Sequence, residues 1–421
     1  MSFTSAGATG PWRRDLALVA AGRAVSLLGD EAVLVALLLG VSRAATPTSS
    51  AGLTVAALLL AALLPALLLA PVAGLAVDRL RTKPLVISLT LVQAVACVGL
   101  ALTDHLAVVL VLVVVLNAGQ AVVSPAWSAL VPSVVPTQRV PGALATVQTV
   151  VAAASVVAPA LGGLLVAVGG TAAACAANAV SYLVLAGCAA LLSRQRVPRP
   201  EPSDGRPTSA VAESLAGFRL VVTDRALLAL FALLGLFVLA LGAVNVAEVF
   251  FITRVLGAGP LVYGLIGVVF AGGMLLGTTL SRTGRDDAGL ARRIVLAVAV
   301  MTVAMLAIGL SPNVVAAGLA SGFVGVGNGM LNVRAQQLVV SRTPRSMLGR
   351  VFAALTAVAN AGAVAALAVG AALLSGVGAR GVFIVAACAA GVAVLLASAP
   401  LLRAAARSRP PITGEPAPAT A

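Results

Sequence analysis

Long apolar runs constrain the fold of this chain more than any other feature of its 421 residues. Hydrophobic residues make up 61% of the sequence and charged residues only 10%, whereas soluble domains have about 25% charged residues. A water-soluble fold cannot bury so much apolar surface, so most of it must face lipid. Because an apolar helix needs about 20 residues to cross a bilayer, we expect an all-α membrane protein that crosses many times.

Twelve candidate membrane-spanning helices follow from the positions where proline, glycine and charged residues interrupt the apolar runs. They predict an N-terminal tail (1–15), a six-helix bundle (16–192), a Pro-rich linker (193–225), a second six-helix bundle (226–402) and a disordered C-terminal tail (403–421). The candidate helices are residues 16–41, 52–77, 85–103, 106–130, 141–168, 172–192, 226–253, 261–280, 294–310, 314–339, 351–375 and 382–402.

The distribution of basic residues predicts the orientation of these helices. With the N-terminus in the cytoplasm, 22 of the 27 Lys and Arg residues lie in inner segments and three lie in outer segments. Inner loops of membrane proteins carry such an excess of positive charge, so we expect both termini in the cytoplasm. Although the net charge is +14, no single element concentrates the arginines, which argues against a nucleic-acid partner.

Matching spacings in the two halves indicate an internal repeat and predict two pseudo-symmetric bundles. In one match, a glycine is followed by polar residues four and five positions later, and the copies lie 203 residues apart. In the other, an asparagine precedes an Arg-Val pair by 22 residues, and the copies lie 211 residues apart. The first match pairs Gly74, Asp78 and Arg79 with Gly277, Ser281 and Arg282, and the second pairs Asn117 and Arg139 with Asn328 and Arg350.

Five ionisable residues lie inside candidate helices: Arg23, Asp30, Glu31, Glu248 and Arg334. A charged side chain at mid-helix costs about 2.5–3.5 kcal/mol on insertion scales, and such residues usually face a bundle interior or a watery cavity. The three carboxyl groups can load a proton from one side and release it to the other, so Asp30, Glu31 and Glu248 are the candidates for proton coupling. The alternative for Asp30 and Glu31 is a structural pair that bonds to polar groups across helices.

Helical geometry separates Asp30 from its charged neighbours. Arg23 lies on the same face but about 10.5 Å away along the axis, and its side chain leans toward the N-terminus, so we expect no direct ion pair. Glu31 is rotated about 100° from Asp30. We therefore expect Asp30 to face a cavity, and Glu31 to tune it or to contact a neighbouring helix.

Polar side chains within the apolar runs predict a substrate cavity, because lipid would leave their hydrogen-bonding groups unsatisfied. Asparagine and glutamine recur in the helix at 106–130, and they crowd the helix at 314–339. The cavity candidates are Arg23, Asn117, Gln120, Asn245, Asn328, Asn332, Arg334 and Gln337.

The segment GLAVDRLRTKP resembles the loop that joins the second and third helices of major facilitator superfamily transporters. The resemblance rests on Gly74, Asp78, Arg79 and Lys83, whereas Arg81 and Thr82 depart from the usual pattern. It implies a fold of two six-helix bundles and a polar lock at the cytoplasmic gate. A positively charged anchor turn is the alternative for this segment.

Two further segments, first SPAWSALVPSVVP and then APALGG, resemble elements of the branch of the superfamily that includes bacterial macrolide-efflux proteins and the enterobactin exporter. The second of them is associated with proton-linked antiporters. The helix at 106–130 lacks the arginine that many drug–proton antiporters have there, and Arg334 is the candidate replacement. The first element contains Pro125, Pro132 and Pro136, and the second contains Pro159, Gly162 and Gly163.

This resemblance implies a monomeric exporter in a bacterial inner membrane, which uses the proton gradient and no cofactor or metal to move an amphipathic small molecule by alternating access. The molecule would be a drug, an antibiotic or a siderophore-like compound. A nutrient importer or facilitator of the same fold and a non-transporting membrane sensor or scaffold are the alternatives. An enzyme is not expected, because the sequence has no phosphate-binding loop, catalytic Ser/His/Asp set or metal cluster.

Overall fold

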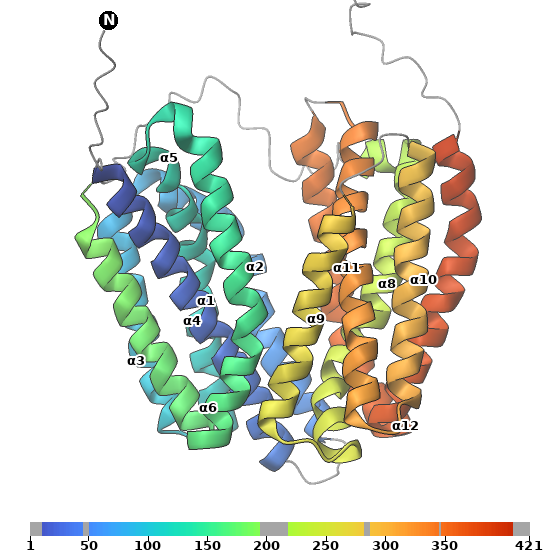
Figure 1. Cartoon of the computed structure of the whole chain (residues 1–421), viewed down its shortest axis with the longest axis horizontal. Helices are drawn as coiled ribbons and strands as arrows, with labels where there is room; N and C mark the ends of the chain where they lie inside the picture. Colours follow the sequence, from blue (N-terminus) through green and yellow to red (C-terminus); the bar gives the residue numbers. More distant parts are fainter. Residues whose placement is uncertain (1–10, 45–49, 194–217, 282–286, 345–346, 407–421) are drawn as a thin grey trace, which may run out of the picture. The chain divides into compact units, whose positions relative to one another are not determined.

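The computed structural model of the chain describes residues 11–44, 50–193, 218–281, 287–344 and 347–406, and every regular element within them is helical (Figure 1). The all-helical membrane fold is therefore confirmed. The helices of the first half are α1 (Pro11–Ala44), α2 (Ser50–Arg79), α3 (Thr82–Ala101), α4 (Leu106–Ser128), α5 (Val131–Val134) and α6 (Val140–Leu191). Those of the second half are α8 (Arg225–Phe250), α9 (Pro260–Leu280), α10 (Asp287–Leu310), α11 (Val314–Arg342) and α12 (Leu348–Ala406).

Ten of the described helices are long and apolar enough to cross a membrane. The number is ten rather than twelve because α6 and α12 run for 52 and 59 residues, more than twice the length that one crossing needs. Each leaves the helical conformation at a glycine break, at Gly169 and Gly170 in α6 and at Gly378 in α12. Two pairs of expected helices are thus joined without a loop, and the count of twelve holds only if each long helix is counted as two.

The described residues form two compact units. The first unit contains α1 to α6 together with residues 252–268, and the second unit contains residues 218–251, residues 269–280 of α9, and α10 to α12. In the first unit, α1 packs along α6, α2 packs along α4, and α3 contacts both α4 and α6. In the second unit, α8 packs along α12, and α10 lies against α11 and α12.

The interior of each unit depends on close helix packing. In the first unit, a buried cluster includes Val19 and Trp127, and the Trp127 indole donates a hydrogen bond to the Val19 carbonyl oxygen at 2.7 Å. In the second unit, a Cβ atom at Gly277 of α9 or at Gly325 of α11 would overlap a backbone oxygen of the other helix. Small residues of this kind let helix backbones approach closely where lipid provides no hydrophobic drive.

The glycine break in α12 leads to a stability prediction. Gly378 has φ 70° and ψ 173°, a region that residues other than glycine enter at a cost of about 1–3 kcal/mol. Gly378→Ala should therefore lower the unfolding temperature of the detergent-purified protein by several degrees. Gly376→Ala is the matched control, because Gly376 is helical and a Cβ atom there meets nothing within 4 Å. Equal unfolding temperatures for the two variants would contradict a required break at Gly378.

Candidate functional site

The carboxylate of Asp30 lies at the centre of a polar cluster in the first unit. Its Oδ1 accepts hydrogen bonds from the Tyr182 hydroxyl at 2.5 Å and from Asn178 Nδ2 at 3.4 Å. Its Oδ2 accepts from Gln120 Nε2 at 2.5 Å and from Ser26 Oγ at 3.5 Å. Donors from α1, α4 and α6 thus converge on one carboxylate, and they supply the partners that a charge inside a membrane-spanning helix requires.

A second layer of buried polar side chains holds these donors in place. Asn178 Oδ1 accepts from Ser181 Oγ at 2.7 Å, and Gln93 Nε2 donates to a backbone carbonyl of α4 at 2.8 Å and to the Tyr182 oxygen at 3.4 Å. Gly29 permits this arrangement, because a Cβ atom there would overlap the Asn178 amide and the Ser181 hydroxyl. The sequence reasoning missed Gln93, Asn178 and Tyr182, whose shared signal is a polar group inside an apolar run.

A cavity of about 140 Å³ adjoins this cluster and has room for a few water molecules. Asp30 and Glu31 both line it, so Glu31 does not contact only a neighbouring helix. The two side chains diverge by about 100° around the helix, and the cavity is wide enough to reach both. The other polar lining residues are Asn117, Gln120, Asn178 and Tyr182.

The cluster is suited to hold Asp30 in either of its charge states. An ionised carboxylate only accepts hydrogen bonds, whereas a protonated one also donates. The hydroxyl groups of Tyr182 and Ser26 can change from donor to acceptor by rotating their hydrogen atoms. Asp30 can therefore gain or lose a proton while the surrounding side chains keep their positions.

Arg23 does not join the Asp30 cluster. Its Nη2 donates to Ser124 Oγ of α4 at 2.8 Å. Among the described residues no ion pair links Arg23 to Asp30, which agrees with the separation expected from helical geometry. Arg23 also does not line the 140 Å³ cavity, so its expected role as a cavity residue finds no support there.

The second unit has a separate cavity of about 320 Å³ between α8, α11 and α12. Asn328 and Asn332 line it, together with Gln336 one turn further along α11. Asn332 Nδ2 donates to Asn328 Oδ1 at 2.7 Å. Most of the remaining wall is apolar and includes Phe237 of α8.

Comparison of the two cavities shows how the internal repeat has diverged. Asn117 and Asn328, which the repeat pairs at a spacing of 211 residues, each line the cavity of their own unit. Gln120 lines the first cavity, whereas Leu331 lines the second at the matching position. The carboxylates are found only at the first of these two cavities.

Arg334 and Gln337 do not line the cavity of the second unit, contrary to expectation. Arg334 is fully buried, and its Nη1 donates to Gln337 Oε1 at 3.0 Å on the same helix. The Arg334 guanidinium thus has a side-chain partner on its own helix, inside the bundle.

The α8 residues Asn245 and Glu248 are not brought together. Asn245 is exposed, Glu248 is half-buried, and no described hydrogen bond joins their side chains. Neither of them lines the 140 Å³ or the 320 Å³ cavity. Glu248 therefore lacks the converging donors that surround Asp30.

The predicted gate motif is only partly described. Gly74 and Asp78 lie in α2, but their side chains fall outside the described residues, and the Arg79 side chain is exposed. Lys83 donates to two carbonyl oxygens at the C-terminal end of α6, one of them that of Leu192. A cation at this position complements the helix dipole, so Lys83 fastens α3 to α6 within the first unit.

The proline–glycine element of α6 lies at helix crossings. A Cβ atom at Gly162 would lie 2.9 Å from the Cα atom of Ala32, which directly follows the carboxylate pair of α1. A Cβ atom at Gly163 would overlap the carbonyl oxygen of Pro260, and the Pro159 carbonyl lies against the same segment of α9. The element thus lets α6 approach α1 beside the Asp30 cluster.

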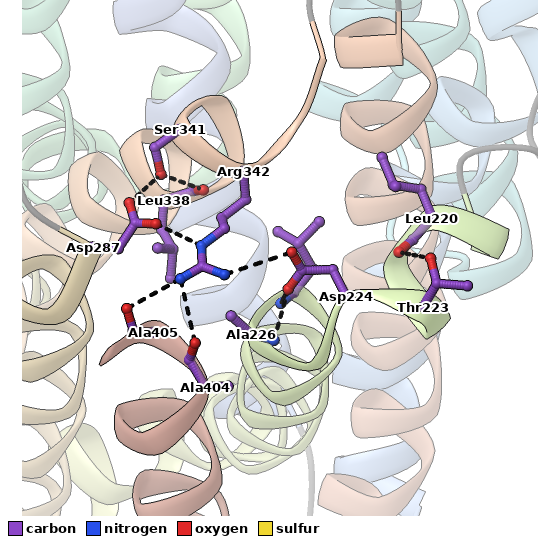
Figure 2. Close-up of polar contacts among 11 residues, drawn as sticks. Leu220, Thr223, Asp224, Ala226, Asp287, Leu338, Ser341, Arg342, Ala404 and Ala405 are labelled. Carbon is purple, nitrogen blue, oxygen red and sulfur yellow. Dashed lines mark hydrogen bonds and ion pairs between the residues drawn. The ribbon is translucent and has the colours of Figure 1, made fainter. Parts of the chain in front are cut away.

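Arg342 at the C-terminal end of α11 organises a second polar cluster, which lies in the second unit (Figure 2). Its Nε donates to Asp287 Oδ2 at 2.5 Å, and its Nη1 lies 3.7 Å from Asp224 Oδ2. Its Nη2 donates to the carbonyl oxygens of Ala404 and Ala405 at 3.3 and 3.1 Å. One guanidinium therefore joins the beginnings of α8 and α10 to the ends of α11 and α12.

Further hydrogen bonds fix the two aspartates of this cluster. Asp224 Oδ1 accepts from the backbone nitrogens of Ala226 and Leu227 at 2.8 and 3.1 Å, as an N-cap residue does. Asp287 Oδ1 accepts from Ser341 Oγ at 2.7 Å. The sequence reasoning counted Arg342 only as an inner positive charge, and an aspartate directly before an apolar run was the available signal for its partner.

Comparison with known proteins indicates a membrane transporter rather than an enzyme, and it defines the class of this chain. The chain belongs to the Major Facilitator Superfamily, whose family model matches residues 19–354. No curated protein sequence matches the chain.

Solved structures of other transporters share this fold. A bacterial homologue of the human lysosomal transporter Spinster has a TM-score of 0.70 at 14% identity, covering 94% of this chain and 99% of that one. The nucleoside transporter NupG has a TM-score of 0.72 at 12% identity, with coverages of 92% and 99%. A D-xylose–proton symporter has a TM-score of 0.69 at 15% identity, with coverages of 92% and 97%. At these identities the similarity establishes the fold alone.

The Arg342 cluster leads to a second stability prediction. Arg342→Met should lower the free energy of unfolding by about 1–3 kcal/mol, because it leaves two half-buried aspartates without their cation. Arg342→Lys should lower it less, since lysine keeps the charge but lacks the guanidinium fork. Unfolding of the detergent-purified protein measures both effects, with the exposed Arg292→Met of α10 as the control. If Arg342→Met is as stable as Arg292→Met, the cluster does not stabilise the second unit.

Proposed function

We propose that this protein is a proton-coupled exporter of an amphipathic small molecule, such as a drug, an antibiotic or a siderophore-like compound. It resides in the cytoplasmic membrane of a bacterium, works as a monomer by alternating access, and needs no cofactor besides the proton gradient. Membership of the superfamily establishes that it is a transporter. The coupling ion, the direction and the substrate class are the proposal.

The surroundings of the Asp30 carboxylate are the main support for proton coupling. This carboxylate lies inside a membrane-spanning helix, accepts four hydrogen bonds, and lines a cavity with a second carboxylate, that of Glu31. Asn117 and Gln120 line the same cavity, so a substrate group that enters it meets the proton site directly. In the proposed cycle, ionised Asp30 accompanies uptake of substrate from the cytoplasm, and protonation of Asp30 from outside accompanies its release. Glu248, with no comparable donors, is the secondary candidate.

Export rather than import is supported by the resemblance to the macrolide-efflux and enterobactin-exporter branch. The proline–glycine element that carries this resemblance packs against α1 beside Asp30, through Gly162. A change in the packing of α6 against α1 would therefore alter the surroundings of the Asp30 carboxylate. The substrate class rests on the same resemblance.

The proposed orientation predicts the location of the termini. Green fluorescent protein fused after residue 421 is expected to fluoresce and alkaline phosphatase at the same place to be inactive, because both ends lie in the cytoplasm. Fusions after residue 104, between α3 and α4, should show the opposite pattern and serve as the control. An active phosphatase at residue 421 would reverse the orientation.

The proton role of Asp30 predicts a specific loss in Asp30→Asn. A deletion strain screened against antibiotics, siderophores and secreted metabolites first identifies a substrate through increased sensitivity. Inverted membrane vesicles with the wild-type protein should then accumulate that substrate when their interior is acidified. Asp30→Asn should reduce this accumulation at least tenfold, because an amide cannot carry the proton, while substrate exchange without a pH gradient persists.

Comparison with the other carboxylates sharpens this test. Glu31→Gln should reduce the pH-driven accumulation of substrate less than Asp30→Asn does, and Glu248→Gln should reduce it least. Full pH-driven accumulation in Asp30→Asn would refute the assignment of the proton site. Movement of substrate out of the vesicles together with protons would identify an importer, and the absence of any flux would favour a sensor or scaffold.

A further inference from the structure

A larger cavity of about 730 Å³, here called the vestibule, opens at one end of the first unit. It lies where α1 and α3 end, where α2 and α4 begin, and where α6 breaks at Gly169 and Gly170. Its lining includes Thr54 and the exposed Asp104. A carboxylate at the mouth of a cavity raises the local concentration of cations.

The vestibule and the Asp30 cavity lie along the same helix faces. On α1, Leu37 lines both of them. On α2, Thr54 lines the vestibule and Leu58 lines the Asp30 cavity, and on α4 the corresponding pair is Val109 and Val113. Residues four positions apart lie on one face of a helix. Three helices therefore form continuous walls from the vestibule to the cavity that contains the carboxylates.

Three buried aliphatic side chains lie where the two spaces adjoin: Leu37 lines both, and Leu58 and Val113 line the Asp30 cavity one helical turn from Thr54 and Val109 of the vestibule. Leu37 is 8% exposed, Leu58 1% and Val113 3%. Leu37 lies on the same face of α1 as Asp30 and about 10.5 Å from it along the axis. A narrow apolar constriction of this kind stays dry and conducts only when its side chains move apart.

We propose that the first unit contains its own proton-access route to Asp30, which leads from the vestibule through the constriction of Leu37, Leu58 and Val113. This inference rests on the proposed function, which makes Asp30 the proton site and places the vestibule on the outer side. All residues of the route belong to the first unit. The route therefore persists through any movement of one unit relative to the other.

A route within one unit separates the path of the proton from the movement that exposes the substrate. When the constriction opens, the outer proton reaches Asp30 without passing along the path of the substrate. The constriction must also close again, because a permanently wet route would let protons leak across the membrane. Enlarging the constriction should convert coupled proton transfer into a leak that still depends on Asp30.

Proton flux into proteoliposomes, followed with an enclosed pH-sensitive dye and no substrate, tests this dependence. Leu37→Ala is expected to raise the proton flux about tenfold, and the double variant Leu37→Ala/Asp30→Asn to lose that increase. Leu38→Ala is the matched control, because Leu38 is 7% exposed and lines neither cavity. If Leu37→Ala does not fold, Leu58→Ala opens the same constriction from α2. An unchanged flux in the folded variant overturns the route.

Chemical accessibility tests the route without any transport. In a chain whose four native cysteines are replaced by alanine, Thr54→Cys should react rapidly with a membrane-impermeant cationic thiol reagent added outside. Leu34→Cys, in the Asp30 cavity, should react at least tenfold faster when Leu37→Ala is added, but not when Leu38→Ala is added. Equal rates in the two backgrounds overturn the route.

The two proposals fail in different ways. If the accessibility test fails while Asp30→Asn still abolishes pH-driven transport, the route is wrong and the proposed function stands. If Leu34→Cys reacts as expected but Asp30→Asn stays fully coupled, the proposed function is wrong, and the route loses its proton role with it.

Discussion

The absence of water from the bilayer interior governs where every polar group of this protein lies. Backbone groups are satisfied within helices, and a charged side chain in a span is costly unless polar groups surround it. Asp30 obtains four donors from α1, α4 and α6, and Arg23 obtains the hydroxyl of Ser124. Because such bonds hold only if the helices keep their rotations, the polar residues fix the packing of the apolar ones.

The two units differ in which polar side chains they contain and in where those side chains lie. The first unit places its carboxylates at a cavity in its interior, and the second has an asparagine pair and mostly apolar walls in the comparable place. The second unit concentrates its charges at helix ends, where Arg342 joins four helices. The two units thus share Asn117 and Asn328 at matching cavity positions, whereas the carboxylates of the proposed proton site line only the first of the two cavities.

The features that depend on composition were predictable, and those that depend on helix rotation were not. The apolar runs predicted the helices because lipid leaves few alternatives, and Asp30 stood out because a carboxylate there is costly. The partnership of Asp30 with Tyr182 depends on how α6 is turned against α1, which no spacing within α1 records. Helical rotation separates Asp30 from Glu31 by about 100°, but rotation alone does not predict the width of the cavity, whose wall includes both side chains. Glycine is typical both of loops between helices and of breaks within one helix. The sequence therefore does not distinguish a loop from the break at Gly169 and Gly170.

The glycine break in α6 also has a mechanical consequence. A loop of several residues would allow the two segments of α6 to slide past one another, but a turn of only Gly169 and Gly170 leaves no slack. The segment with Pro159 and Gly162 therefore cannot move far along its axis without also moving the segment with Tyr182, whose hydroxyl donates a hydrogen bond to Asp30.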